Sequence, residues 1–426
     1  MGKIYTDKNV LDASLERLHY IFNNFEHIYF SISGGKDSSV MVQLADIVAK
    51  KLGKQFDVLL IDLEAQYNMT MQHIEDLKQL SSINQFYHVC LELEVGNAVS
   101  IFEPKWITWD NMKQDIWVRE MPDGVINKDN HDFDFVKPNM TFFDFIELFP
   151  KWLATKHNCS VACGVGIRTD ESLNRFRAIV TDKKVRFNNL NWTTKVHEDV
   201  FNFYPLYDWK TEDIWGATFR LDLKFNQVYE LMNKNGLSIH EQRLCQPFGL
   251  DQRQGLDQYK AIEPETWEKL VNRVSGANMG ALYARTKLIG HLGTCKPNHM
   301  CWEEYSVFMI ESIGLYCPEI MNHYIDKIQR VLWWYEVNKQ VSMSDDEVGH
   351  EKANWRRIAK AIEKNDFWFK GLSFGETKRG YKYLEKIKSK YEKIFEIIDT
   401  EDKVSKHKWV KEWKGDEQNK IPSNEC

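Results

Sequence analysis

Short apolar runs alternate with longer amphipathic segments along the first half of the chain. Strand-like runs, rich in Ile, Val, Phe and Tyr or in small residues, lie at 27–30, 56–61, 86–91 and 160–167. Segments with apolar residues at helical spacing lie at 12–23, 40–49, 68–80 and 142–156. The run at 56–61 is almost continuously apolar, which is typical of a parallel strand covered on both faces. This order predicts an α/β fold with a doubly wound, mainly parallel sheet.

Individual residues fit the expected ends of these helices. Asp12 or Ser14 is expected to cap the first helix, and Gly53 to end the second. Thr211 is expected to cap a further helix that follows a turn at 205–209. On physical grounds alone, this last helix is a packing element.

The junction between the first strand and the second helix has an unusual composition. It reads Ser31-Ile32-Ser33-Gly34-Gly35-Lys36-Asp37-Ser38-Ser39. Unpaired backbone N–H groups at a helix N-terminus, together with the helix dipole, form an anion site. The glycines let the backbone approach an oxyanion closely, and Lys36 adds a mobile positive charge. An ordinary glycine-containing turn is the alternative, but the full combination favours phosphate binding.

The end of the second strand supports a nucleotide site at this position. Asp62 follows the run at 56–61 directly. Ligands of doubly wound sheets lie beyond the carboxyl ends of the strands. The junction at 31–39, called the phosphate loop below, and Asp62 both fall at that edge. Residues 104–150 then break the pattern with aromatic residues among Asp, Lys and Asn. Such a segment is an insertion that either packs as a flap or contacts substrate as a lid.

An arginine-rich segment follows the strand at 160–167. Residues 170–172 suit a helix start, and capping explains these acids as well as catalysis does. Arg168 precedes that helix and has no capping role, so we expect it to contact an anion beside the phosphate loop. Arg175 follows in the helix, where it is expected to help orient an acceptor.

Composition narrows the class of protein. The chain has 426 residues, 43% of them hydrophobic, which allows two or three domains. The net charge of −6 gives no global argument for binding nucleic acid or membrane. We find no apolar run long enough to span a bilayer and no signal peptide at the N-terminus, so a cytoplasmic protein is expected. Eight cysteines are too few for a disulfide framework.

Three segments together resemble the PAPS-reductase and ATP-sulfurylase branch of the PP-loop ATP pyrophosphatases. They are Ser33–Ser38, Gly166–Ser172 with Arg175, and Pro205–Trp209 running into Asp213–Trp215. The resemblance covers about residues 10–220 and implies a Rossmann-like, adenine nucleotide α-hydrolase-like sheet that binds ATP or an adenylyl-sulfate with Mg²⁺. It places the phosphates in the loop, the adenosine near Asp62 and the transferred anion near Arg168.

These arguments give two sets of site residues within an expected nucleotide-binding domain at 1–220. Nucleotide binding is expected of Ser31, Ser33, Gly34, Gly35, Lys36, Asp37, Ser38, Asp62 and Gly166. Acceptor binding or catalysis is expected of Lys36, Asp37, Arg168, Asp170, Glu171 and Arg175.

Beyond residue 220 the resemblance narrows to one group. Segments 243–256, 262–267 and 276–283 look like the IbrA type of PAPS-reductase-related proteins, found in bacteria or phage. That group is linked to gene regulation and sits beside genes for ParB-like proteins, so the resemblance implies a ParB-like partner. A helical, family-specific domain is expected at 221–340.

The cysteines separate this chain from the assimilatory reductases. Those enzymes attack the sulfonyl group with a cysteine in a Glu-Cys-Gly-Leu-His-type segment, whereas this sequence ends Pro422-Ser423-Asn424-Glu425-Cys426. Cys426 has no basic neighbour to lower its pKa and is not expected to be a nucleophile. Cys245, Cys295 and Cys301 are the candidates for a reactive thiol, a zinc site or an iron–sulfur cluster, with ordinary thiols as the alternative.

The C-terminal region is basic. Residues 351–426 have 19 Lys and Arg against 14 Asp and Glu, and helices are expected at 303–340, 355–362 and 381–398. The region 341–426 is therefore expected to be helical with a flexible tail. Its basic helices either contact nucleic acid or an acidic partner, or present a solvated face.

Three functions are compatible with this sequence. The first is cleavage of ATP between the α- and β-phosphates, with adenylylation of an acceptor. The second is thiol-dependent reduction of an adenylyl-sulfate through Cys245. The third is a nucleotide-responsive regulator that acts through a ParB-like partner or nucleic acid.

Overall fold

The structure, a computed structural model, describes residues 6–99, 105–181, 184–249, 255–274, 276–277, 296–315, 318–339, 343–346, 353–364, 366 and 369–372. The chain forms two compact units. The first comprises residues 1–96 and 105–277, and the second residues 97–104 and 278–426. The domain boundary expected at residue 220 lies inside the first unit, and the helix expected at 381–398 lies outside the described residues.

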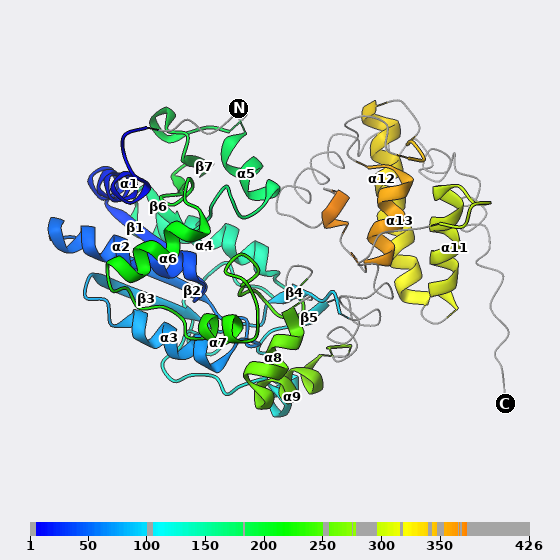
Figure 1. The fold of residues 1–426 in the computed structure, drawn as a ribbon, viewed down its shortest axis with the longest axis horizontal. Helices are drawn as coiled ribbons and strands as arrows, with labels where there is room; N and C mark the ends of the chain where they lie inside the picture. The colour runs from blue at the N-terminus through cyan, green and yellow to red at the C-terminus, as the bar shows by residue number, and fades with distance from the viewer. Residues whose placement is uncertain are drawn as a thin grey trace. The chain divides into compact units, whose positions relative to one another are not determined.

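A six-stranded sheet forms the centre of the first unit (Figure 1). Its strands are β1 (His27–Ile32), β2 (Phe56–Ile61), β3 (Ile83–Val89), β6 (Val161–Val165), β7 (Thr193–His197) and β8 (Val200–Phe203). Their order is β3-β2-β1-β6-β8-β7, and every neighbouring pair is parallel except β7 with β8. The predicted α/β fold with a mainly parallel sheet is confirmed.

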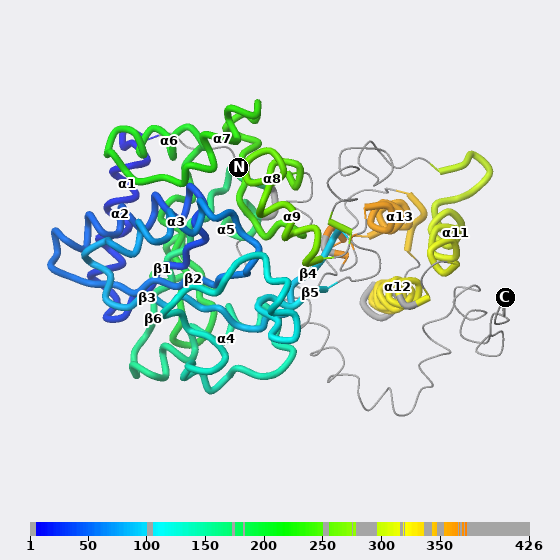
Figure 2. Tube along the Cα trace, turned by 90° about the horizontal axis from the view of Figure 1, so that it is seen from below, coloured from blue at the N-terminus to red at the C-terminus, as the bar shows by residue number. Residues whose placement is uncertain are grey.

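Helices cover both faces of the sheet, as Figure 2 shows from the side. Helices α1 (Val10–Asn24), α2 (Lys36–Leu52), α3 (Asn68–Lys78) and α6 (Thr211–Arg220) pack on one face, and α4 (Phe142–His157) packs on the other. The unit also contains α5 (Leu173–Val180), α7 (Val228–Lys234), α8 (Leu256–Ile262) and α9 (Pro264–Arg273). Alternate residues of β1 divide the core, because Ile28 and Phe30 pack with α1, α2, α3 and α6, whereas Tyr29 packs with α4.

Two expected caps differ from the structure. Helix α1 is capped by Asn9, whose side-chain oxygen accepts the Asp12 N–H at 2.9 Å. Ser14 is instead buried, and its hydroxyl donates to the carbonyl of Pro205 at 2.9 Å. Helix α6 begins at Thr211 with Lys210 in the cap position. In both cases the cap residue lies N-terminal to the expected one, and the hydroxyls of Ser14 and Thr211 make tertiary contacts instead.

The irregular segment after residue 104 packs against the edge of the sheet. Strands β4 (Glu94–Gly96) and β5 (Lys105–Ile107) form an antiparallel pair, and the 3₁₀-helix η1 (Asn111–Ile116) follows. Ile126 continues the sheet beyond β3, since its N–H donates to the carbonyl of His88 at 2.8 Å. Trp106, Trp109 and Phe133 are buried. These contacts support the packing interpretation of the segment.

The second unit is helical where it is described. Its elements are α11 (Trp302–Gly314), α12 (Pro318–Lys339), α13 (Trp355–Glu363) and η5 (Lys370–Leu372). Ile310, Ile328 and Ile358 belong to its core. The carboxylate of Asp345 accepts the first two N–H groups of α11, those of Trp302 and Glu303, at 3.1 and 2.9 Å. None of the described helices is long and apolar enough to cross a membrane.

Acid is expected to weaken the contact between α2 and α3. His73 is 3% exposed and its Nε2 lies 2.8 Å from the Ser39 hydroxyl, and burial lowers the pKa of His73 from 6.5 to about 4. The unfolded chain therefore binds more protons between these two pKa values, so stability is lost as the pH falls from 6.5 towards 4. We expect urea unfolding to give about 2 kcal/mol less stability at pH 5 than at pH 7 from this residue.

The matched variants are His73→Gln and His19→Gln. His73→Gln should flatten the pH dependence, whereas His19 is exposed and its replacement should leave the dependence as it is. An unchanged slope in the His73→Gln protein would contradict the assignment.

Candidate nucleotide site

The loop between β1 and α2 has a backbone that needs glycine. Gly34 has a φ of +71°, and a Cβ at this position would lie 2.6 Å from Cγ2 of Thr70. Gly35 is the N-cap of α2 and supplies no capping side chain. Ser38 closes the loop, since its hydroxyl accepts the Ser33 N–H at 3.2 Å and donates to the Gly35 carbonyl at 3.0 Å. The loop thus presents the N-terminus of a 17-residue helix.

The loop after β6 lies directly against the phosphate loop. Strands β1 and β6 are parallel neighbours, with Ser31 opposite Val165. A Cβ on Gly166 would lie 3.0 Å from both N and Cα of Ser38, so only glycine allows this approach. The two loops meet where the strand order reverses, which is the usual ligand position in doubly wound sheets.

Arg168 brings a buried guanidinium to this junction. The side chain is 2% exposed, its Nε donates to the Asp37 carboxylate, and its Nη2 lies 3.4 Å from the hydroxyl of Thr211. Its Nη1 is buried without a hydrogen-bond partner among the described residues. Asp37 also lies 3.8 Å from Nζ of Lys36, so one carboxylate faces two cations. The excess positive charge and the unpaired donor favour an anion here.

Lys36 is held by residues that the sequence did not single out. Its backbone N–H donates to the Tyr229 hydroxyl at 3.0 Å, and its Nζ donates to the Gln242 carbonyl at 3.1 Å. Burial lowers the pKa of Lys36, and Asp37 opposes that shift. The Asn226 amide donates to the Gly34 carbonyl at 3.1 Å. No motif marks these residues, which reach the loop from beyond residue 220.

The remaining residues of the arginine-rich segment lie nearer the surface. Asp170 is exposed, and Glu171 pairs with Arg175 at 3.0 Å. Ser172 caps α5 by accepting the Arg175 N–H at 3.2 Å. The structure therefore joins Arg168 directly to the loop, whereas Glu171 pairs with Arg175 and the capping role falls to Ser172.

Asp62 lies at the end of β2 but is already engaged. Its carboxylate contacts His88 at 2.8 Å and the Arg119 guanidinium, and it accepts the Glu64 N–H at 3.0 Å. Burial raises the pKa of Asp62, but Arg119 and His88 outweigh this and hold it at about 2. Asp62 is thus an ionised, fully buried member of an ion-pair network.

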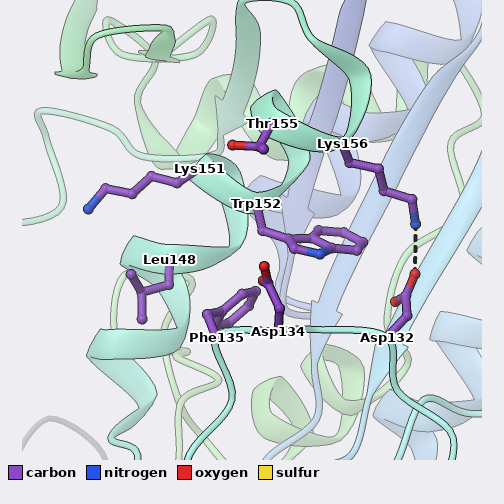
Figure 3. Close-up of a pocket in the computed structure, with 8 residues that line it drawn as sticks. All are labelled: Asp132, Asp134, Phe135, Leu148, Lys151, Trp152, Thr155 and Lys156. Carbon is purple, nitrogen blue, oxygen red and sulfur yellow. Dashed lines mark hydrogen bonds and ion pairs between the residues drawn. The ribbon is translucent and has the colours of Figure 1, made fainter.

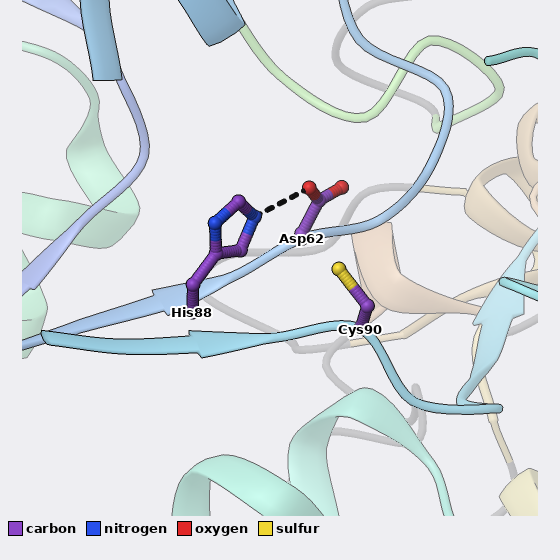
Figure 4. A group of neighbouring side chains, drawn as sticks. All are labelled: Asp62, His88 and Cys90. Atoms are coloured by element: carbon purple, nitrogen blue, oxygen red, sulfur yellow. Dashed lines mark hydrogen bonds and ion pairs between the residues drawn. The ribbon is translucent and has the colours of Figure 1, made fainter. Parts of the chain in front are cut away.

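Asp62, His88 and Cys90 place their ligand atoms within 4.8 Å of one another, a spacing that could hold a metal (Figure 4). Two cations oppose this use. Arg119 contacts Asp62, and Nζ of Lys78 lies 3.2 Å from Nδ1 of His88. Because the ammonium can only donate, it favours the tautomer in which His88 Nε2–H donates to Asp62. The donor set therefore fits a charge network better than a metal.

Comparison with known proteins identifies the family. The model of the phosphoadenosine phosphosulfate reductase domain matches residues 27–232, and a domain of unknown function, DUF3440, matches residues 236–353. The uncharacterized protein YbdN of Escherichia coli K12 is 38% identical over 403 residues, which cover 91% of this chain and 96% of YbdN. The chain belongs to the phosphoadenosine phosphosulfate reductase family. The IbrA-type assignment stays a prediction.

Solved structures with a similar arrangement include two nucleotide enzymes. Phosphoadenylyl-sulfate reductase from Candida auris, in a phosphate complex, is 14% identical, with 54% of this chain and 94% of that chain covered and a TM-score of 0.29. FMN adenylyltransferase from Candida glabrata, in complex with ATP, is 14% identical, with 53% and 62% covered and a TM-score of 0.30.

The candidate cysteines belong to different parts of the structure. Cys245 is exposed in the first unit. Burial raises the pKa of Tyr229, the residue that contacts Lys36, and Asp37 and Cys245 add smaller contributions in the same direction. Cys301 belongs to the second unit and caps α11, with its sulfur accepting the Glu304 N–H at 3.4 Å. Cys295 lies outside the described residues. The expected three-cysteine metal site thus stays a prediction.

A separate hollow of about 470 Å³ lies beside α4 (Figure 3). Trp152 and Phe135 line it, and Lys156 pairs with Asp132 at 2.8 Å across its edge. It contains none of the expected site residues of this reductase-family chain. The phosphate loop, rather than this hollow, combines a helix N-terminus with buried cations.

Proposed function

We propose that the chain binds ATP at the phosphate loop and cleaves it between the α- and β-phosphates, transferring the adenylyl group to an acceptor oxyanion. The observation that carries the proposal is the buried Nη1 of Arg168, which has no partner among the described residues and lies beside Lys36 and Asp37. Family membership supports nucleotide binding, and the charge excess supports a phosphate or another oxyanion as ligand.

Different residues have different roles in this transfer. The N-terminal amides of α2 and the Lys36 ammonium bind the β- and γ-phosphates. Arg168 orients the acceptor or the α-phosphate through a planar guanidinium. An acceptor oxygen attacks the α-phosphorus, the bond to the bridging oxygen breaks, and pyrophosphate leaves with the electron pair. Catalysis is then mainly positioning and charge stabilisation.

The carboxylates near the site suit Mg²⁺ only when it arrives with the nucleotide. Asp37 already faces Lys36 and Arg168, and Asp62 already contacts Arg119 and His88. Mg²⁺ commonly binds through substrate phosphates and keeps several waters. We therefore treat MgATP as the substrate, with the ion neutralising phosphate charge.

Pyrophosphate release tests the proposal. The protein is incubated with MgATP and a panel of oxyanion acceptors, including sulfate and carboxylates, and pyrophosphate is measured. We expect Lys36→Ala to lower kcat/KM by about 100-fold, because a buried charge next to the phosphates is lost. Lys50→Ala, on the far end of α2, is the matched control.

The outcomes separate the candidate functions. Activity that is the same in the Lys36→Ala and wild-type proteins would show that the loop is not the site. Tight ATP binding without pyrophosphate release across the panel would contradict the transferase and favour the nucleotide-responsive regulator, for which co-purification of a ParB-like partner is the next measurement.

Thiol-dependent reduction of an adenylyl-sulfate is a second candidate, favoured by family membership and by the exposed thiol of Cys245 in the first unit. In this reaction the Cys245 thiolate attacks the sulfonyl sulfur and displaces the adenosine phosphate, and a thiol reductant then releases sulfite with formation of a disulfide. Reductase activity that survives in Cys245→Ser would remove the candidate.

A further inference from the structure

Two oxygen atoms in residues 226–242 accept hydrogen bonds from donors of the phosphate loop. The Tyr229 hydroxyl accepts the N–H of Lys36 at 3.0 Å, and the Gln242 carbonyl accepts from its Nζ at 3.1 Å. Both contacts are buried. A main-chain amide at the first position of α2 and a lysine ammonium are the groups that would otherwise donate to phosphate oxygens.

These oxygens are fixed in place. Tyr229 is 3% exposed, and its ring lies edge-on to Trp215 with a centroid distance of 5.5 Å. The Gln242 side chain is 1% exposed, and its Nε2 donates to the Leu237 carbonyl at 3.1 Å, which holds the turn that presents its backbone oxygen. Asn226 is fully buried and ties the start of the segment to Gly34 at 3.1 Å.

We propose that residues 226–242 act as an internal stand-in for phosphate, so that the nucleotide must displace the Tyr229 hydroxyl and the Gln242 carbonyl from Lys36 to bind. The inference rests on the proposed function, since it concerns the regulation of that same site. Arg168 Nη1 keeps no partner among the described residues and is the donor that first meets the incoming anion. A movement of residues 226–242 away from Lys36 would then raise the affinity for nucleotide.

Removal of the Tyr229 hydroxyl tests the inference, because it should strengthen nucleotide binding rather than weaken it. In Tyr229→Phe the ring stays, but the buried Lys36 N–H loses its acceptor in the nucleotide-free protein. A bound phosphate oxygen then accepts a hydrogen bond from this N–H. The free energy of binding becomes more favourable, because the variant lacks this hydrogen bond without nucleotide. We expect the Kd for MgATP and for inorganic pyrophosphate, measured by isothermal titration calorimetry, to fall by about 5- to 10-fold.

Three further variants complete the experiment. Tyr87→Phe removes a hydroxyl from the far face of the sheet and should leave both Kd values unchanged. Gln242→Ala loosens the turn and should also tighten binding. Displacement of Tyr229 should change tryptophan fluorescence on ligand addition, and Trp215→Phe should reduce that change among the 15 tryptophans of the chain.

The results distinguish the inference from the function on which it rests. If Tyr229→Phe binds MgATP more weakly or equally well, and Lys36→Ala binds it more weakly, residues 226–242 do not compete with phosphate. The loop then remains the nucleotide site. Unchanged binding in Lys36→Ala would overturn the site itself. Thermal unfolding of each variant confirms that a lost signal does not come from a lost fold.

Discussion

Arg168→Ala is expected to lower kcat/KM for pyrophosphate release by about 1,000-fold, with a larger effect on kcat than on KM. The guanidinium is 2% exposed and lies at the junction of both loops, where developing charge would be poorly screened by water. Removing one fixed donor from such a position costs about 100- to 1,000-fold, and an arginine that neutralises phosphoryl charge contributes more.

Arg168→Lys serves as the conservative comparison. A lysine can restore the charge beside Asp37, but it cannot also reach Thr211 and the bound anion as a planar fork does. We therefore expect only partial recovery of kcat. Equal rates in the wild-type and Arg168→Ala proteins, in an assay where Lys36→Ala shows its expected loss, would exclude Arg168 from the reaction.

Arg273→Ala is expected to destabilise the first unit by about 3–5 kcal/mol, because it leaves a buried carboxylate without its charge partner. Glu64 is fully buried with a φ of +64°, and its carboxylate receives Nε and Nη2 of Arg273 at 2.7 and 3.0 Å. The same carboxylate accepts the N–H groups of Trp109 and Val118 at 2.8 and 3.0 Å. One residue thus fixes β2, the irregular segment and α9 together.

Urea unfolding of a matched pair measures this effect. Arg175→Ala breaks an ion pair with Glu171 whose side chains are 42% and 20% exposed, and it should cost less than about 1 kcal/mol. The double variant Glu64→Gln/Arg273→Met should lose less than the sum of its single changes, because neither charge is then left alone. Additive losses would show that the two side chains do not act as a pair.

Local periodicity was sufficient for the main elements. The strand expected at 56–61 matches β2, and Gly53 ends α2 in the left-handed conformation that its position required. Strands β7 and β8 were not predicted, because they have only 5 and 4 residues, too few for a clear apolar period. Their place in the sheet depends on pairing with β6 and with each other, which no local pattern encodes.

The arrangement of the candidate site could be predicted where a motif fixes the backbone. The phosphate loop and Arg168 come together because β1 and β6 are neighbours in the sheet. The partners of Lys36 were missed, since Tyr229 and Gln242 lie 193 and 206 residues away in sequence. The position of Asp62 was clear, but its contact with Arg119 depends on a segment with no regular period.

The contacts of Gln242 and Arg273 bear on how this chain could be divided or recombined. The two family models meet between residues 232 and 236, so the boundary passes between Tyr229 and Gln242, which hold the same lysine. Arg273 lies on the DUF3440 side and neutralises Glu64 on the reductase side. A fragment ending at the boundary would lack the Gln242 contact to Lys36 and the Arg273 contact to Glu64, so the two matched regions share contacts that a division would remove.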